Sequence, residues 1–243
     1  MIYFRQFLVG FLLKALAYAQ FALPSFQAVA VKDNVGPRIT ITATDGSNAV
    51  ASGSITNDAT LSLTFTANEV TSGFIYSDIL IVGGSISSFS GSGTTYYATF
   101  TPSASGATTI DVAGSTFTDA AGNNNSAASQ FNWTYDGTLP TITGVSLASD
   151  NSTIAVTFSE AVYTTAGGSG SLVTSDFVFS ISGGSATLSS STPSSISASS
   201  NTYTLGISLS GTANGSETLT VNPANSAIFD VVGNAASNSQ SNN

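Results

Sequence analysis

Two similar stretches show the structural pattern of this chain most clearly: "LTFTANEV", Leu63–Val70, and "VTFSEAV", Val156–Val162. In both stretches apolar residues alternate with Thr or Ser, and an acidic residue follows, Glu69 in the first and Glu160 in the second. A period of two is typical of a β-strand that buries one face and exposes the other. The pattern therefore predicts a sheet, and its recurrence predicts that the sheet-forming unit is present twice.

Three further pairs of segments recur in the same order along the chain. They are "GPRITI" (36–41) with "LPTITGV" (139–145), "SDILIVGGSISSFS" (77–90) with "SDFVFSISGGSATLSS" (175–190), and "FTDAAGN" (117–123) with "FDVVGN" (229–234). Each copy has about 100 residues, which is the size of one domain. The turn-rich linker "YDGTLP", 135–140, separates the copies. We therefore expect two domains, residues 36–137 and residues 138–243.

Alternating apolar residues predict seven strands in the first copy, and Gly, Asn, Ser and Pro separate them. The predicted strands are residues 38–44, 60–66, 77–82, 85–90, 95–101, 107–113 and 129–135. Seven short strands in about 100 residues are typical of an immunoglobulin-like (Ig-like) sandwich. The expected fold class is all-β, with two tandem Ig-like β-sandwich domains. The last strand of the second copy aligns with "SNSQSNN", 237–243, which lacks apolar alternation, so we expect this repeat to be C-terminally incomplete.

The charged residues exclude several classes of function. Only 7% of the residues are charged, against roughly 25% in typical soluble domains. All four Lys and Arg residues lie at or before Arg38, and the chain has no His and no Cys. Binding to nucleic acid or to an anionic membrane surface needs cationic side chains, so neither is expected. The excess of acidic residues favours cations as partners.

The N-terminal residues resemble an export signal. Residues 1–30 contain Arg5, then a largely apolar run, then the small-x-small triplet Ala28–Ala30. A second such triplet lies at Ala17–Ala19. The alternative is a membrane anchor, but the uncharged stretch Ala15–Val31 is short for a span of about 20 residues. We therefore predict a signal peptide over 1–30 and a secreted or cell-surface protein.

The repeated motifs together resemble a known family. "TFSEAV", "SDF" followed by "ISGG", and the Phe-x-Asp-x-x-Gly-Asn phrase are similar to the bacterial Ig-like repeats of large surface adhesins and other cell-envelope proteins. The similarity extends from about residue 36 to the C-terminus. It implies a non-catalytic spacer or stalk in cell adhesion, with neighbouring repeats of the same array as partners.

Two other functions remain open at this stage. Such repeats also form ligand-binding tips, so the chain could be a carbohydrate- or ligand-binding accessory module that contacts cell-surface or matrix glycans. Exposed aromatic residues would mark that surface, and the candidates are Tyr76, Tyr96, Tyr97 and Tyr163. The other alternative is a self-assembling component of a surface layer or matrix.

No catalytic site is expected. Proton transfer near neutral pH needs a tuned acid or base, and beyond Arg38 only Asp, Glu and Tyr side chains are available. No general base accompanies any Ser, and "GGSGS" lacks the strand-turn-helix setting of a nucleophile elbow.

Acidic residues from distant parts of each copy should meet at one end of the sandwich. The linker before the first strand, the loop after the second strand and the loop before the last strand all lie at that end. The second copy supplies Asp136, Glu160 and Asp230 with Asn234 as a further oxygen donor, and the first supplies Asp33, Glu69 and Asp119 with Asn123.

Such a group of like charges predicts a cation. Carboxylates that lie close together repel unless something offsets them. Ca²⁺ takes six to eight oxygen ligands, and the resemblance implies calcium-stiffened junctions, so we expect Ca²⁺ at these groups. The alternative is that Asp119 and Asp230 only close turns with Gly122 and Gly233. The two interpretations are compatible, and the standard calcium-loop signatures are missing.

Overall fold

The structure, a computed structural model, describes residues 32–243. The prediction of an all-β fold is confirmed, because strands dominate and the helical segments are two single 3₁₀ turns within that range. None of the helices in residues 32–243 is long and apolar enough to span a membrane. The predicted signal peptide, residues 1–30, lies outside the described residues. Val35–Asn243 forms one compact unit.

The strands fall into two groups along the chain. The first group is β1 Ile39–Thr44, β2 Ala49–Val50, β3 Ile55–Thr56, β4 Leu61–Ala67, β5 Ile79–Val82, β6 Gly84–Ser92, β7 Thr95–Pro102, β8 Gly106–Val112 and β9 Phe131–Tyr135. The second group is β10 Ile142–Leu147, β11 Thr153–Phe158, β12 Phe177–Ser182, β13 Thr187–Leu188, β14 Ile196–Ser199, β15 Thr202–Gly206, β16 Leu209–Ser210 and β17 Thr218–Pro223. The 3₁₀ turns are η1 Tyr76–Asp78 and η2 Thr174–Asp176.

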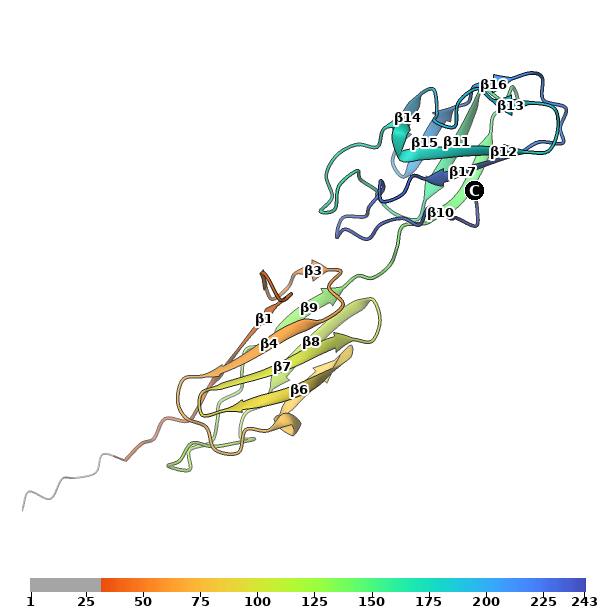
Figure 1. The fold of residues 1–243 in the computed structure, drawn as a ribbon. Helices are drawn as coiled ribbons and strands as arrows, with labels where there is room; N and C mark the ends of the chain where they lie inside the picture. Colours follow the sequence, from red (N-terminus) through yellow and green to blue (C-terminus); the bar gives the residue numbers. More distant parts are fainter. Residues whose placement is uncertain (1–31) are drawn as a thin grey trace, which may run out of the picture. The chain divides into compact units, whose positions relative to one another are not determined.

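The first group forms two sheets that share one interior. One sheet has the order β2-β1-β4-β7-β6, of which β4, β7 and β6 can be followed side by side in Figure 1. The other has the order β3-β9-β8-β5. All seven predicted strands are present. The predicted alternation is present in β4, where Leu61, Leu63 and Phe65 are buried and the residues between them are exposed or half-buried. Burial of these side chains from water drives the sheets together.

Trp133 from one sheet and Phe100 from the other pack edge to face in this interior, with ring centroids 5.7 Å apart. Both side chains are almost completely buried. Offset and edge-to-face aromatic pairs contribute about 0.5–1.5 kcal/mol beyond the area they bury.

The strands of the second group form three smaller sheets. The sheets of this group have the orders β10-β11-β15-β14, β12-β17 and β13-β16. Phe158, Phe177 and Tyr203 form a cluster of aromatic rings in its interior. Residues 237–243, which align with the last strand of the first copy and lack its apolar alternation, contain no strand. There the backbone oxygen of Asn243 accepts one hydrogen bond from the Val221 N–H at 3.3 Å.

The buried hydrophobic residues form two separate clusters. One extends along the sequence from Ile39 to Trp133 and the other from Ile142 to Ala236. None of the strand pairs in residues 32–243 joins the first group of strands to the second. The segments on either side of the linker therefore build separate interiors.

Candidate metal centre

The structure brings Asp136, Glu160 and Asp230 together. Asp136 directly follows β9, Glu160 lies two residues after β11, and Asp230 lies in the loop after β17. One carboxylate oxygen from each residue lies within 4.8 Å of those of the other two. Asp230 is fully buried, while Asp136 and Glu160 are half-buried. The sheet topology therefore gathers these side chains as the sequence predicted.

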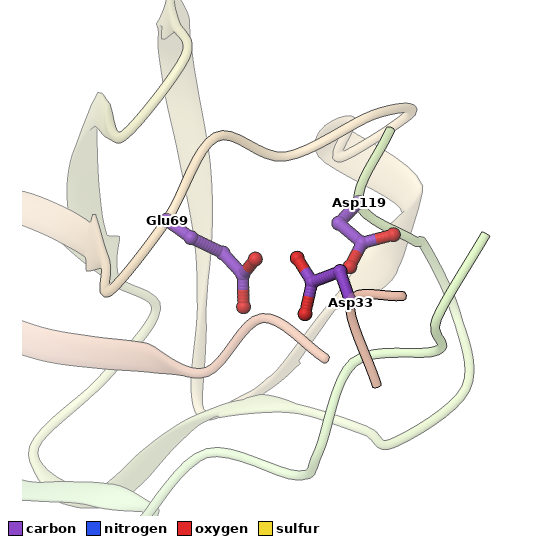
Figure 2. A group of neighbouring side chains, drawn as sticks. All are labelled: Asp33, Glu69 and Asp119. Carbon is purple, nitrogen blue, oxygen red and sulfur yellow. The ribbon is translucent and has the colours of Figure 1, made fainter. Parts of the chain in front are cut away.

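The equivalent residues of the first repeat also lie together. Figure 2 shows Asp33, Glu69 and Asp119 as neighbours, and their carboxylate oxygens meet the same 4.8 Å limit. Asp119 is buried, Glu69 is half-buried and Asp33 is exposed. Asp33 precedes the compact unit that begins at Val35, whereas the group around Asp230 lies wholly inside that unit.

A tight turn fixes the Asp230 carboxylate. Its Oδ1 accepts hydrogen bonds from the backbone N–H groups of Val232, Gly233 and Asn234, at 2.7–2.9 Å. Gly233 has a φ of +99°, a conformation that residues with a Cβ adopt only with strain. The predicted turn-closing role of Asp230 is therefore present in the structure. The turn also presents a rigid carboxylate to its neighbours Asp136 and Glu160.

Asp119 closes the equivalent turn of the first repeat. Its Oδ1 accepts from the Asn123 N–H at 2.8 Å, and Gly122 has a φ of +85°. Burial by itself would raise the pKa of Asp119, but the hydrogen bonds from Asn123, Ala121 and Gly122 together outweigh it and hold the pKa below its usual value. The carboxylate is therefore favoured in its charged form.

Asn234 does not direct its oxygen into the acidic group. Its Nδ2 donates to Asp230 Oδ2 and to the backbone oxygen of Asp136, both at 2.8 Å. Its Oδ1 accepts from Asn57 Nδ2 at 3.2 Å. In this orientation Asn234 positions the carboxylate and does not supply the predicted oxygen ligand. Asn57 was not predicted, because its loop after β3 is not among the repeated motifs.

Asn123 has the same orientation in the first repeat. Its Nδ2 donates to Asp119 Oδ2 at 2.7 Å and to the backbone oxygen of Val35 at 3.3 Å. The predicted role of Asn123 as an oxygen donor does not fit this geometry either. The turn uses Asp119 Oδ1, and the amide nitrogen of Asn123 donates a hydrogen bond to the other carboxylate oxygen, Oδ2.

The group around Asp230 lies in a segment, residues 39–243, whose sequence contains acidic side chains but no basic ones. Burial raises the pKa of Glu160, and the charges of Asp230 and Asp136 raise it further. The sequence has no Lys, Arg or His after Arg38. The negative charge of these three carboxylates can be reduced in two ways: one of them takes up a proton, or the group binds a cation.

The geometry of the three carboxylates fits Ca²⁺. Oxygens bound to one Ca²⁺ lie about 2.3–2.6 Å from the ion, so two of them can be at most about 5.2 Å apart. The carboxylate oxygens of Asp136, Glu160 and Asp230 lie inside that limit. Three carboxylates supply hard oxygen ligands, and water would complete a shell of six to eight.

The tyrosines proposed for glycan contact do not share one environment. Tyr76 and Tyr97 are 53% and 52% exposed, and Tyr163 is half-buried. Tyr96 is buried, stacks on Phe89 and shares a hydrogen bond of 2.7 Å with Thr71. Its prediction as an exposed residue is wrong, because neighbours on a strand point to opposite faces and Tyr97 takes the outer one.

Glu217 is a structural acid that the sequence did not reveal. Its carboxylate accepts hydrogen bonds from the backbone N–H groups of Ser185, Ala186, Asn214 and Gly215. These bonds, led by that from Ala186, lower the pKa of Glu217 to about 2. Glu217 therefore links two loops of the second group of strands through a carboxylate that is charged at neutral pH.

Comparison with known proteins finds a similarity to one family for part of the chain. Residues 33–135 match the family model of the bacterial Ig-like domain, which confirms the predicted resemblance for that segment. Among solved structures, InvD of Yersinia pseudotuberculosis is similar at 17% sequence identity with a TM-score of 0.30. The match covers 80% of this chain and 54% of the InvD chain, so this chain spans about half of that protein. No curated protein sequence matches.

Proposed function

We propose that this chain, whose residues 33–135 are a bacterial Ig-like domain, is a non-catalytic spacer of a secreted or surface-attached bacterial adhesin. Residues 36–137 and 138–243 are its two tandem repeats, and residues 1–30 are its export signal. The two separate hydrophobic interiors support the division into repeats. Its partners are neighbouring repeats of the same array. Such a spacer needs a stable fold and a controlled junction, but no reactive group.

In this proposal Ca²⁺ binds Asp136, Glu160 and Asp230 and stiffens the junction. The observation that carries it is the approach of these three carboxylates to within 4.8 Å of one another. Asp136 belongs to the linker, whereas Glu160 and Asp230 belong to loops of the second repeat. An ion bound by all three side chains therefore ties the linker to the repeat that follows it.

The charge of the group makes the junction responsive to calcium. Without the ion, the mutual repulsion of Asp136, Glu160 and Asp230 favours their separation. With the ion, the same charges become ligands and hold the linker in place. Asn234 supports both states, because its hydrogen bonds to Asp230 and to the Asp136 backbone oxygen orient the site.

Small-angle X-ray scattering of the whole chain tests the proposal. Millimolar calcium should narrow the distribution of interatomic distances relative to the chelated protein. Asp230→Asn should remove this response, since it deletes a ligand charge. The matched control is Asp150→Asn, at an acid that accepts its hydrogen bonds from Ser152 and lies outside the group.

Two results would contradict the calcium proposal. One is a wild-type scattering curve, together with a calorimetric titration, that calcium does not change. The other is an Asp150→Asn chain that loses the response to the same degree as Asp230→Asn. Circular dichroism of each variant establishes that the fold is retained.

A second function, glycan binding, draws support from the exposed rings of Tyr76 and Tyr97. Aromatic faces in contact with water can stack on apolar faces of sugars. A glycan array probed with the whole chain separates this function from that of a spacer. Binding of the wild-type chain to a glycan, together with loss of that binding in a Tyr76→Ala, Tyr97→Ala double variant, would favour the glycan-binding function.

A further inference from the structure

The connection after the first strand differs between the two groups. In the first group, residues 45–60 join β1 to β4 and carry the short strands β2 and β3. In the second group, residues 148–152 join β10 to β11 and contain no strand. The β3 segment, residues 51–58, is therefore present in the first group only. Connections between strands often carry residues that contact a partner.

Hydrogen bonds anchor the β3 segment to the first group. β3 runs parallel to β9, and the N–H of Thr134 in β9 donates to the backbone oxygen of Ser54 at 3.0 Å. The indole Nε1 of the buried Trp133 donates to Thr56 Oγ1, also at 3.0 Å. A buried indole N–H needs such a partner, so this bond ties the segment to the interior. The β3 segment is therefore a fixed part of the first group.

The ladder between β3 and β9 continues into the linker at Asp136. The Asp136 N–H donates to the backbone oxygen of Thr56 at 2.9 Å. The backbone oxygen of Asp136 accepts from Asn234 Nδ2 at 2.8 Å, and Asn234 belongs to the second group. The peptide groups on the two sides of Asp136 are thus bonded to different groups of strands. Because both bonds use the backbone, they do not need the Asp136 carboxylate.

Asn57, near the end of the β3 segment, contacts the second group directly. Its Nδ2 donates to Asn234 Oδ1 at 3.2 Å. The same nitrogen lies beside the turn that Asp230 closes, since a Cβ placed on Gly233 would lie 3.7 Å from it. Asn234 is buried, and a buried amide oxygen without a partner would cost free energy. Asn57 supplies that partner from the first group.

We infer that the β3 segment is the surface through which the first group of strands holds the second, with or without a bound cation. Asn57 is its contact residue. Its partner is the turn Asp230–Asn234, which has the sequence Asp-x-x-Gly-Asn. This contact is distinct from the calcium site of the proposed function, because amide and backbone groups form it.

The turn presents the Asn234 oxygen in a fixed orientation. Asn234 Nδ2 donates to Asp230 Oδ2 and to the Asp136 oxygen, so Oδ1 is left for Asn57. A side chain that meets Oδ1 must donate a hydrogen bond, and Asn57 does so with an uncharged group. Salt screens the repulsion between exposed charges, but it has little effect on an uncharged contact.

Amide hydrogen exchange of the whole chain in chelator, followed by NMR, tests the inference. The probe is the N–H of Asp136 in the linker. Asn57→Ala removes one bond between the two groups, so exchange at Asp136 should accelerate roughly two- to tenfold, as expected for the loss of one hydrogen bond. The acceleration should be the same in low and in high salt. Asn57→Asp keeps the shape but cannot donate, so it should accelerate exchange at least as much.

Asn48→Ala is the matched control. Asn48 lies in the same connection of the first group, is exposed and bonds to Asp45. In this variant, exchange at Asp136 should equal that of the wild type. Circular dichroism and the fluorescence of Trp133 establish that each variant is folded.

Three results would overturn the inference. The first is exchange at Asp136 that Asn57→Ala leaves unchanged. The second is equal acceleration in Asn48→Ala, which would trace the effect to a looser connection and not to the contact. The third is wild-type behaviour of Asn57→Asp, which would show that the donated bond has no part. Failure of calcium binding looks different: a chain that calcium does not change, but in which Asn57→Ala accelerates exchange in chelator, would refute the calcium site and support the contact.

Discussion

Replacing Glu160 by Gln should have opposite effects in the absence and in the presence of calcium. Glu160 shares its surroundings with Asp136 and Asp230, and no basic residue follows Arg38 in the sequence. Without calcium, Glu160→Gln removes a repelling charge and should raise the melting temperature. With calcium, the same change removes a ligand and should reduce the stabilisation that the ion provides.

The structure sets the size of both effects. Two unit charges 4.8 Å apart repel by about 1 kcal/mol in bulk water, and Glu160 faces two of them. The two repulsions together amount to about 2 kcal/mol, and salt at physiological ionic strength roughly halves this energy to about 1 kcal/mol. For a chain of this size, that energy corresponds to a change of about 2–4 °C in melting temperature. Calcium at about five to fifty times its Kd should stabilise the wild type by about 1–2 kcal/mol.

Differential scanning calorimetry in chelator and in millimolar calcium measures both effects. The variant should melt above the wild type in chelator, and the difference should shrink or reverse in calcium. Because the pKa of Glu160 is raised in the folded chain, protonation favours folding. The stability from protonated Glu160 is full below its ordinary pKa near 4.5 and is lost as pH rises through the folded pKa. The advantage of the variant in chelator should therefore disappear below about pH 4.5.

The reasoning is refuted if Glu160→Gln melts below the wild type in chelator at neutral pH. That outcome would mean that Glu160 makes favourable contacts that outweigh its repulsion from Asp136 and Asp230. An identical calcium response in the variant and the wild type would show that Glu160 is not a ligand. Asp150→Asn serves as the control, and its calcium response should equal that of the wild type.

Two further predictions concern the second repeat. Glu217→Gln should lower the melting temperature at neutral pH, because the backbone N–H groups that Glu217 binds lose a charged acceptor. The folded pKa of about 2 lies below the ordinary 4.5, so the stability from Glu217 is present above pH 4.5 and is lost as pH falls towards 2. Thermal melts across this range should show the difference between the two chains closing, and a constant difference would contradict the assignment. Phe177→Ala should cost about 3–5 kcal/mol by urea denaturation, since the side chain is fully buried, and a cost below about 1 kcal/mol would show that the interior collapses around the gap.

Much of the fold could be predicted because the sequence is regular at the scale of single strands. The alternation of Leu61, Leu63 and Phe65 fixes both the strand β4 and its buried face. The two-residue strands β2 and β3 could not be predicted in this way, because a period of two has no meaning over two residues. Tyr96 shows the remaining weakness, since its place beside Tyr97 suggested an aromatic surface until the register with Phe65 placed it inside.

The acidic groups could be predicted from topology, but their details could not. The repeated motif and the expected order of strands were enough to bring Asp136, Glu160 and Asp230 to one end of a sandwich. The orientation of the Asn234 amide depends on competing partners, namely Asp230 and Asn57, which only coordinates resolve. The hydrogen bonds of Glu217 depend on four backbone N–H groups from two loops. The sequence contains no residue pattern that predicts that these two loops meet at Glu217.

The single tryptophan of the chain, Trp133, is buried against Phe100 in the first interior, and the second interior contains none. Intrinsic fluorescence excited at the indole band therefore reports on one of the two interiors only. Far-ultraviolet circular dichroism, by contrast, reports on the strands around both interiors. Recording the two signals together would reveal whether the halves lose their structure in one step or in succession, without a label or a truncated chain.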